Sequence, residues 1–203
     1  MDLERLEEVK KIAREEHVPI LMDEAIELIE TILAIKKPTK ILEVGTAVGF
    51  SAMLFSKYIP EDGVIDTIEI NAETAKKALE NIKYCNCTKK INVINEDATT
   101  YMKEMKNDEM YDVCFIDAAK GQYNVYLEEG LRMLKKGGII IADNVLFKGR
   151  VLSDYNEHKH RTAVNRLRTF IKRIKEDENL ISTVLDCGDG VAICYKKWYN
   201  ISA

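Results

Sequence analysis

The sequence predicts a single α/β domain built on a seven-stranded, mostly parallel sheet, with helices before it and an antiparallel hairpin at its end. Three observations predict this fold class. The chain has 203 residues, which is the length of one ordinary domain. After Pro38, short apolar runs alternate with helical stretches, as in repeated strand–helix–strand units. Near the end, two apolar runs flank a short turn rich in glycine and aspartate, which predicts a hairpin.

Two helices are expected first, so that residues 1–37 form a helical preface to an α/β core over residues 38–203, all within one domain of residues 1–203. Apolar side chains recur at near-helical spacing in both segments, which predicts an amphipathic helix in each. These positions are Leu3, Leu6, Val9 and Ile12 in the first helix and Ala25, Ile26, Ile29 and Leu33 in the second.

Seven short apolar runs are predicted to be strands. The five parallel ones are Ile41 to Val44, Val64 to Ile68, Ile91 to Ile94, Val113 to Ile116 and Ile139 to Ala142. The hairpin strands are Leu180 to Leu185 and Val191 to Tyr195, on either side of the turn Cys187-Gly-Asp-Gly190. Because nucleotide-dependent dehydrogenases normally continue with parallel strands, a terminal hairpin favours the methyltransferase variant of such a sheet.

The composition excludes several protein classes. Apolar residues make up 46% of the chain and charged residues 32%, which is typical of a folded globular protein. No window approaches the roughly 18 uncharged apolar residues of a membrane helix, and the acidic start differs from a signal peptide, so we expect a cytoplasmic protein without a membrane partner. Cys85 and Cys87 have no second cysteine pair or histidine nearby, which disfavours a zinc site.

The segment after the first predicted strand favours a site for S-adenosylmethionine. It reads Glu43-Val-Gly-Thr-Ala-Val-Gly49, and its glycines allow a sharp turn close to a ligand. Ala47 stands where a dinucleotide-binding loop has its middle glycine, which hinders a pyrophosphate, whereas S-adenosylmethionine has no phosphate. The Glu43 carboxylate suits a ligand that carries an ammonium and a sulfonium. The cofactor-binding residues expected here are Glu43, Gly45, Thr46 and Ala47.

Two further strand ends are expected to complete this site. Glu69 ends the second strand, 24 residues beyond Gly45, where an acidic side chain can accept both ribose hydroxyls. Asp97 and Ala98 follow the third strand, where a carboxylate and an amide can meet the adenine ring. Each feature alone more often has only a structural role, but their occurrence at the ends of successive strands favours the cofactor site.

Oxygen-bearing side chains follow the next two strands. Asp117 ends the fourth strand, and Asp143 and Asn144 end the fifth, so all three are expected at the sheet edge where α/β folds bind ligands. Such ligands suit Mg²⁺, Mn²⁺ or Ca²⁺ rather than zinc, and we expect Mg²⁺. The alternative is that Asp143-Asn144 only forms a turn. Lys120 lies three residues after Asp117, and a partly desolvated lysine beside a metal can act as a general base.

One basic segment lies on an otherwise acidic chain. From Lys148 to Lys175 there are nine Lys or Arg against two acids, a local charge of +7. Because the net charge of the chain is −4, the remaining residues together carry −11. The stretch directly after the metal ligands contains Arg150 and Arg161, which are the expected substrate contacts, since phosphates favour such a composition. For the helix that follows, a solvated basic face over a buried apolar stripe is the simpler interpretation.

With these residues assembled, the sequence resembles the cation-dependent O-methyltransferases, the family of catechol and caffeoyl-coenzyme A O-methyltransferases, from about His17 to Tyr195. The motifs are Leu42-Glu-Val-Gly-Thr-Ala-Val-Gly-Phe-Ser51, Phe115-Ile-Asp-Ala-Ala-Lys-Gly-Gln-Tyr123 and Asp143-Asn-Val-Leu-Phe-Lys-Gly-Arg-Val151. The resemblance implies a Rossmann-like class I methyltransferase fold, a metal on Asp117, Asp143 and Asn144, and Lys120 as the base. It implies cofactor contacts by Met22, Ser51, Glu69, Asp97, Ala98 and Asp117.

The resemblance is greatest to the bacterial branch that methylates 5-hydroxyuridine in tRNA, through His17-Val-Pro-Ile-Leu-Met22, Asn144-Val-Leu-Phe and Gly188-Asp-Gly-Val-Ala. It therefore implies a tRNA-modifying enzyme, and its apolar N-terminal helices and its relatives suggest a homodimer. Ala119 departs from the Trp of catechol-type enzymes, which speaks against a small flat catechol. A catechol or coenzyme A ester acceptor remains the alternative, and a non-catalytic RNA-binding protein is a remote one.

Overall fold

The computed structural model of the protein describes residues 1–153 and 158–198. Seven strands form one sheet in the order β3-β2-β1-β4-β5-β7-β6. The predicted fold class is confirmed, with N-terminal helices, a mostly parallel sheet and antiparallel strands at the end of the chain. Its internal contacts divide the chain into two compact units, Met1–Tyr101 and Met102–Ala203.

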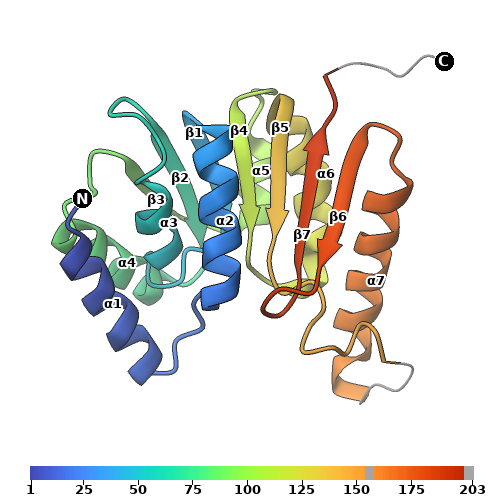
Figure 1. The fold of residues 1–203 in the computed structure, drawn as a ribbon, viewed down its shortest axis with the longest axis horizontal. Coiled ribbons are helices and arrows are strands. Elements are labelled where there is room, and N and C mark those ends of the chain that lie inside the picture. The colour runs from blue at the N-terminus through green and yellow to red at the C-terminus, as the bar shows by residue number, and fades with distance from the viewer. Residues whose placement is uncertain (154–157, 199–203) are drawn as a thin grey trace. The chain divides into compact units, whose positions relative to one another are not determined.

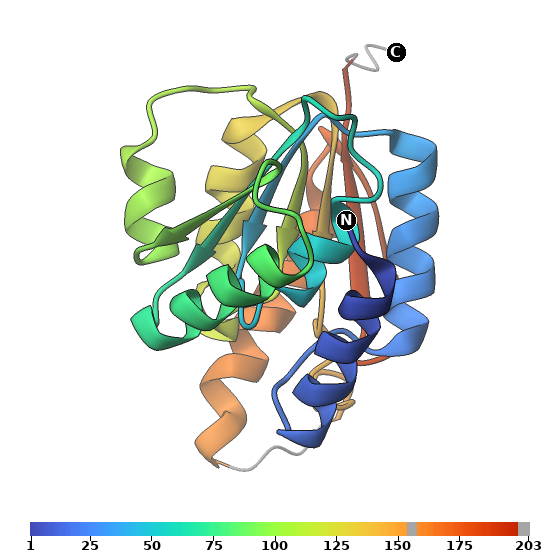
Figure 2. The same ribbon diagram turned by 90° about the vertical axis from the view of Figure 1, so that its left-hand side faces the viewer.

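The first unit carries three parallel strands, β3, β2 and β1, and the helices around them. Its elements are α1 (Leu3–Glu15), α2 (Asp23–Lys36), β1 (Lys40–Val44), α3 (Phe50–Phe55), β2 (Val64–Glu69), α4 (Ala72–Tyr84) and β3 (Ile91–Asn95), and α5 (Ala98–Glu104) begins at its end. Ile41 pairs with Ile65, and Ile65 pairs with Ile91, so the three predicted strands lie in parallel register. Figure 2 shows α2, in blue, upright beside these strands, and α4 packs against β2 and β3.

Both helices of the preface form as predicted, but the first buries a different face. Asp2 caps α1 by accepting a hydrogen bond from the backbone N–H of Arg5. The buried side chains of α1 are Leu6, Val9 and Ala13, whereas Leu3 and Ile12 are exposed. The small Ala13 side chain lets the helix lie close to its neighbours. Apolar spacing alone does not reveal that Ala13, and not Ile12, is the buried residue. In α2 the four predicted residues are all buried.

The second unit carries β4 and β5 in parallel and the antiparallel pair β7 and β6. Its elements are β4 (Tyr111–Ile116), the 3₁₀ turn η1 (Lys120–Gln122), α6 (Tyr123–Met133), β5 (Leu134–Ala142), the 3₁₀ turn η2 (His158–His160), α7 (Arg161–Glu176), β6 (Leu180–Leu185) and β7 (Val191–Lys196). Figure 1 shows β7 and β6 running in opposite directions, with α7 beside β6. The predicted hairpin is confirmed.

Strand β5 begins at Leu134, five residues before its predicted start at Ile139. The segment between reads Leu-Lys-Lys-Gly-Gly, which resembles a turn. The strand continues through it because the register with β4 shifts between Tyr111 and Val113, which is typical of a bulge. Gly137 has a φ of +76°, a conformation that glycine adopts without strain.

Helix α7 is amphipathic in the predicted sense. Its buried side chains are Val164, Leu167, Phe170 and Ile174, and Ile171 is half-buried. Across residues 1–153 and 158–198, no helix combines the length and the apolar character needed to cross a membrane.

Candidate active site

The predicted cofactor loop joins β1 to α3 in the first unit and is held against the end of β2. The backbone N–H groups of Gly45 and Thr46 donate to the carbonyl of Ile68 at 3.0 and 3.2 Å. Gly45 and Gly49 have φ angles of +100° and +83°, which explains why glycine stands at both ends of the turn. Ala47 also has a positive φ, +45°, which is uncommon for a residue with a side chain.

Glu69 is the residue that fixes this strained loop. One carboxylate oxygen accepts a hydrogen bond from the Ala47 N–H at 3.0 Å, and the other accepts from the Asn71 N–H at 2.9 Å. A carboxylate oxygen has more than one acceptor direction, so both can still receive a ribose hydroxyl. The predicted acid and the predicted loop therefore lie in direct contact, which spacing alone did not reveal.

Glu43 is completely buried near the end of β1. Its carboxylate accepts a hydrogen bond of 2.5 Å from the Thr67 hydroxyl, and the hydroxyls of Thr67 and Thr46 are 2.6 Å apart. Glu43 therefore reaches the cofactor loop through two threonine hydroxyls. The sequence does not predict this role of Thr67, because a buried threonine on a strand gives no distinctive signal.

Asp97 directly precedes α5 and caps it. Its carboxylate accepts hydrogen bonds from the Thr99 hydroxyl and from the Thr100 N–H, the latter at 2.9 Å. These bonds, that of Thr99 first, hold the pKa of Asp97 below its ordinary value. Asp97 is thus a fixed, ionised carboxylate directly before the buried Ala98.

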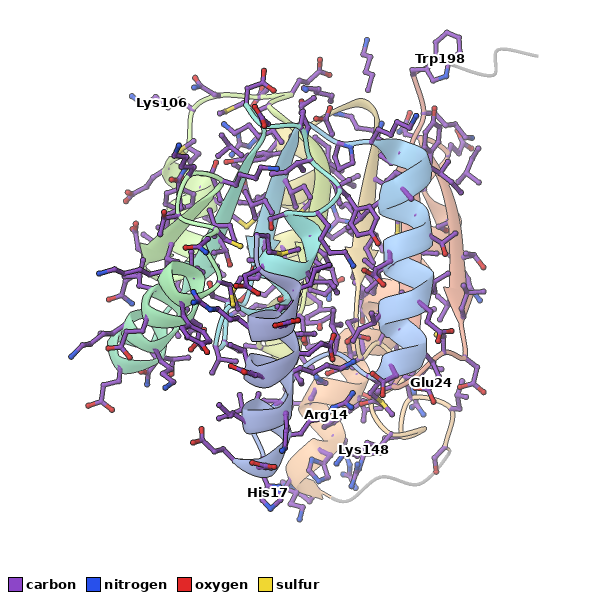
Figure 3. The ribbon with its side chains drawn as sticks, turned by 60° about the vertical axis from the view of Figure 1, so that its left-hand side comes forward. Arg14, His17, Glu24, Lys106, Lys148 and Trp198 are labelled. Atoms are coloured by element: carbon purple, nitrogen blue, oxygen red, sulfur yellow. The ribbon has the colours of Figure 1, made fainter. Side chains whose placement is uncertain are left out.

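Two further predicted cofactor residues lie at the starts of helices in the first unit. Ser51 is half-buried in the first turn of α3. Met22 is 47% exposed and immediately precedes α2. It lines an open hollow of about 420 Å³ between α1 and α2, to which Arg14, His17 and Glu24 also belong (Figure 3).

The predicted metal ligands lie in the second unit, at the carboxyl ends of β4 and β5. Asp117 follows Ile116 and Asp143 follows Ala142, and these two strand residues are register partners. Asp143 is only 2% exposed, and burial, reinforced by the negative charge of Asp117, raises its pKa to about 7. Burial also raises the pKa of Asp117, although the Lys120 ammonium opposes the shift. A buried carboxyl group and a half-buried one near each other create a site that a cation stabilises.

Asn144 and Lys120 join this pair. The Asn144 N–H donates to the Asp143 carboxylate at 2.8 Å, and the Lys120 ammonium donates to the Asn144 side-chain oxygen at 3.3 Å. Asn144 adopts a φ of +57°, a conformation that asparagine tolerates better than most residues. Among the described residues there is no group of three His, Cys, Asp or Glu suited to a metal. The predicted set differs, because its third donor is an amide oxygen.

Three side chains that the sequence did not single out also lie here. Asp189, in the hairpin turn, accepts a hydrogen bond from the Lys148 N–H, and its charge contributes to the raised pKa of both metal-site carboxyls. The Phe147 ring lies 5.4 Å from the Lys120 ammonium. The Tyr123 hydroxyl donates to the Asp143 carbonyl at 2.7 Å. All three stand in stretches that carry the family resemblance, namely the Gly-Asp-Gly turn and the motifs after β4 and β5, but the sequence assigns none of them a role in the site.

Of the two predicted substrate residues, Arg150 contacts a residue of this cluster, whereas Arg161 lies further along the chain. The Arg150 guanidinium lies 5.3 Å from the centre of the Phe147 ring, whereas Arg161 is exposed in the first turn of α7. Arg168 on this helix is engaged internally, since it donates to the carbonyls of Val151 and Ser153. Arg173 likewise donates to the carbonyl of Asn124, so part of the basic helix face is structural.

Comparisons with known proteins agree with this arrangement. A model of the O-methyltransferase family matches residues 2–197. Caffeoyl-CoA O-methyltransferase of Stellaria longipes is 32% identical over 207 residues, covering 96% of this chain and 84% of the relative. Tapetum-specific methyltransferase 1 of Arabidopsis thaliana is 33% identical over 157 residues, covering 75% and 67%.

A solved structure is similar over the same extent. The O-methyltransferase from Bacillus cereus, in complex with SAH, has a TM-score of 0.85 and 25% identity and covers 96% of this chain and 91% of its own. The family match spans the residues of both units. The chain therefore belongs to the O-methyltransferase family and is an S-adenosylmethionine-dependent O-methyltransferase of the caffeoyl-CoA O-methyltransferase type.

Proposed function

We propose that the protein transfers a methyl group from S-adenosylmethionine to one of two vicinal oxygens of a catechol-type acceptor, free or as a coenzyme A ester, with a divalent cation. The cluster of Asp117, Asp143 and Asn144 beside Lys120 carries this proposal, because it combines one buried and one half-buried carboxyl group with a nearby amine. The similarity to the Stellaria longipes enzyme supports the acceptor class.

The first unit would supply the cofactor site. The Gly45 turn and Glu69 are already in contact through the Ala47 N–H, which leaves the Glu69 carboxylate at the surface of the turn. Glu69 would accept the ribose hydroxyls and Asp97 the adenine amine, with Met22 and Ser51 as further contacts. Support comes from the Bacillus cereus relative, whose structure contains SAH.

The second unit would hold the cation. Asp117, Asp143 and Asn144 offer three oxygen donors, the chemistry that Mg²⁺ prefers, and the buried negative charge of the two carboxylates fits a divalent ion. When bound, such an ion lowers the pKa of a coordinated hydroxyl and stabilises the resulting oxyanion. Mg²⁺ is our choice of metal because of the donor set.

Lys120 would be the general base. Its ammonium position is fixed by the Asn144 oxygen at 3.3 Å and lies 5.4 Å from the Phe147 ring. In the neutral form, Lys120 takes the proton of the acceptor hydroxyl while the methyl group passes from the sulfonium to that oxygen. The products are the methyl ether, S-adenosylhomocysteine and a protonated lysine, which returns its proton to solvent. Positioning of the two reactants accounts for several kcal/mol of the rate enhancement.

The test measures methyl transfer from labelled S-adenosylmethionine to a free catechol, to caffeoyl-CoA and to tRNA carrying 5-hydroxyuridine, each with and without a chelator. We expect activity on a catechol-type acceptor that the chelator abolishes. Lys120→Gln should lower kcat by about 100-fold or more, since general acid–base catalysis contributes that much. Lys106→Gln is the matched control, because Lys106 is an exposed lysine of the same unit (Figure 3). Full activity after metal removal would contradict the proposal.

A tRNA substrate is the second candidate, and the basic residues beside the metal cluster favour it. Arg150 lies on the Phe147 ring, and Lys148 and Arg161 are exposed. The O4 and O5 atoms of 5-hydroxyuridine are vicinal, so the same cation could bind both. Activity on the tRNA and none on either catechol-type acceptor would favour this second candidate.

A further inference from the structure

One buried hydroxyl connects the two strand ends that carry the proposed metal ligands. Tyr123 is the first residue of α6 and is completely buried. Its hydroxyl donates a hydrogen bond to the Asp143 carbonyl at 2.7 Å and accepts one from the Ala118 N–H. Ala118 directly follows Asp117, so the hydroxyl bonds to the peptide group that comes immediately after each of the two acidic ligands.

These two bonds continue the sheet beyond its last regular pair. The β4–β5 ladder ends with the bond from the Asp143 N–H to the Ile116 carbonyl, at 2.9 Å. Past this point Asp117 and Asn144 leave the strands, and no ladder bond fixes their separation. The Tyr123 hydroxyl replaces such a bond, because it bridges the N–H after Asp117 and the carbonyl of Asp143.

The same hydroxyl closes a small ring of backbone that contains the proposed base. Residues 118–123 leave β4, pass through η1 and return to the hydroxyl, with Lys120 in the middle. Within the ring, the Gln122 N–H donates to the Ala119 carbonyl at 2.9 Å. The Tyr123 ring is itself fixed, since it packs edge-on to Phe170 with the ring centres 5.6 Å apart. The hydroxyl therefore has little freedom to move.

We infer that Tyr123 is a positioning residue that sets the spacing between Asp117 and Asp143 and orients Lys120 toward them. This inference rests on the proposed function. Tyr123 touches no reacting group. It acts through the backbone of two ligands and of the base, so its loss should weaken metal binding and slow methyl transfer without removing a ligand.

The test is Tyr123→Phe, which removes the hydroxyl and keeps the ring. The matched control is Tyr111→Phe, because Tyr111 is an equally buried tyrosine at the opposite end of β4. Free Mn²⁺ measured by electron paramagnetic resonance gives the metal affinity, and calorimetry gives the affinity for S-adenosylmethionine. In Tyr123→Phe we expect Mn²⁺ to bind about tenfold more weakly and kcat to fall similarly, with cofactor affinity unchanged, as for other groups that orient metal ligands. In Tyr111→Phe we expect wild-type Mn²⁺ affinity.

Two outcomes of the binding measurement would overturn the inference. One is unchanged Mn²⁺ affinity in Tyr123→Phe, and the other is an equal loss of affinity in both variants, which would indicate general destabilisation. A wild-type protein that binds no Mn²⁺ would instead refute the proposed function itself. Amide hydrogen exchange gives a readout that does not need the metal. The Ala118 amide should exchange faster in Tyr123→Phe while the amides of β4 exchange as before, and uniform acceleration would count against the inference.

Discussion

Asp143 combines deep burial with a position in the proposed metal site, and this makes the stability of the protein depend on pH. Its pKa is raised to about 7, first by burial and then by the charge of Asp117. In the unfolded chain the carboxyl titrates near pH 4, so between about pH 4 and 7 the folded state holds the proton more tightly. Stability of the metal-free protein should therefore fall as pH rises through this window.

The variant that checks this is Asp143→Asn, which keeps an oxygen able to accept the Asn144 N–H. The melting temperature of chelator-treated wild type should decline from pH 4 to 7 more steeply than that of Asp143→Asn. Mn²⁺ should raise the wild-type melting temperature more at pH 7.5 than at pH 5, because protons compete for the ligands. Parallel pH profiles of the two proteins would show that Asp143 does not titrate in this range.

Individual site residues could be predicted from the sequence where they directly follow a strand. Asp117, Asp143 and Asn144 come immediately after apolar runs, and parallel strands bring such positions to one edge. Tyr123 and Thr67 could not be predicted, because a buried tyrosine or threonine resembles ordinary core in sequence. The contact between Glu43 and Thr67 could not be predicted either, because it depends on the direction of two side chains, and the role of Glu43 toward the cofactor stays a prediction.

The hairpin turn between β6 and β7 is an element whose shape supports the metal-site loop. The Val145 N–H donates to the Gly190 carbonyl at 2.9 Å, and the Leu146 N–H donates to the Asp189 carbonyl at 3.0 Å. A Cβ at Gly190, whose φ is +89°, would lie 2.3 Å from Leu146 Cγ and 2.8 Å from its backbone nitrogen. This close approach explains why the turn needs glycine at its last position.

Gly190→Ala should therefore destabilise the protein by about 3 kcal/mol, from the clash and the backbone strain together. Gly149→Ala is the matched variant, because its φ is +72° but, apart from its chain neighbours, no atom of the described residues lies within 4 Å of the added Cβ. It should cost only about 1 kcal/mol, the strain alone. Urea unfolding measures both. Equal losses would mean that the loop moves away from the turn without cost.

At the level of elements, the apolar periodicity predicted every strand and both N-terminal helices. It failed at the start of β5, because a glycine-containing bulge looks like a turn when only local composition is considered. It also misjudged the buried face of α1, where Ala13 replaces Ile12 at the interface. Both errors arise from packing against segments distant in sequence.

At the scale of the whole molecule, the charge distribution bears on the acceptor. The chain has a net charge of −4, yet residues 148–175 carry +7. An acceptor with phosphate groups, either a coenzyme A ester or an RNA, would be attracted to that segment and repelled elsewhere. A free catechol is uncharged and would not be attracted to the basic segment. Salt dependence therefore distinguishes the acceptor classes independently of the metal.

Arg161→Gln tests this distribution, since Arg161 is exposed at the start of α7. For a phosphate-bearing acceptor we expect KM to rise about threefold to tenfold at low salt, with the difference shrinking at high salt because the charges are screened. KM for a free catechol should not change. Lys83→Gln, which removes one charge from α4 outside the basic segment, should leave both KM values as they are. A salt-independent rise in KM, or an equal rise for the catechol, would mean that Arg161 acts through the fold and does not attract the acceptor.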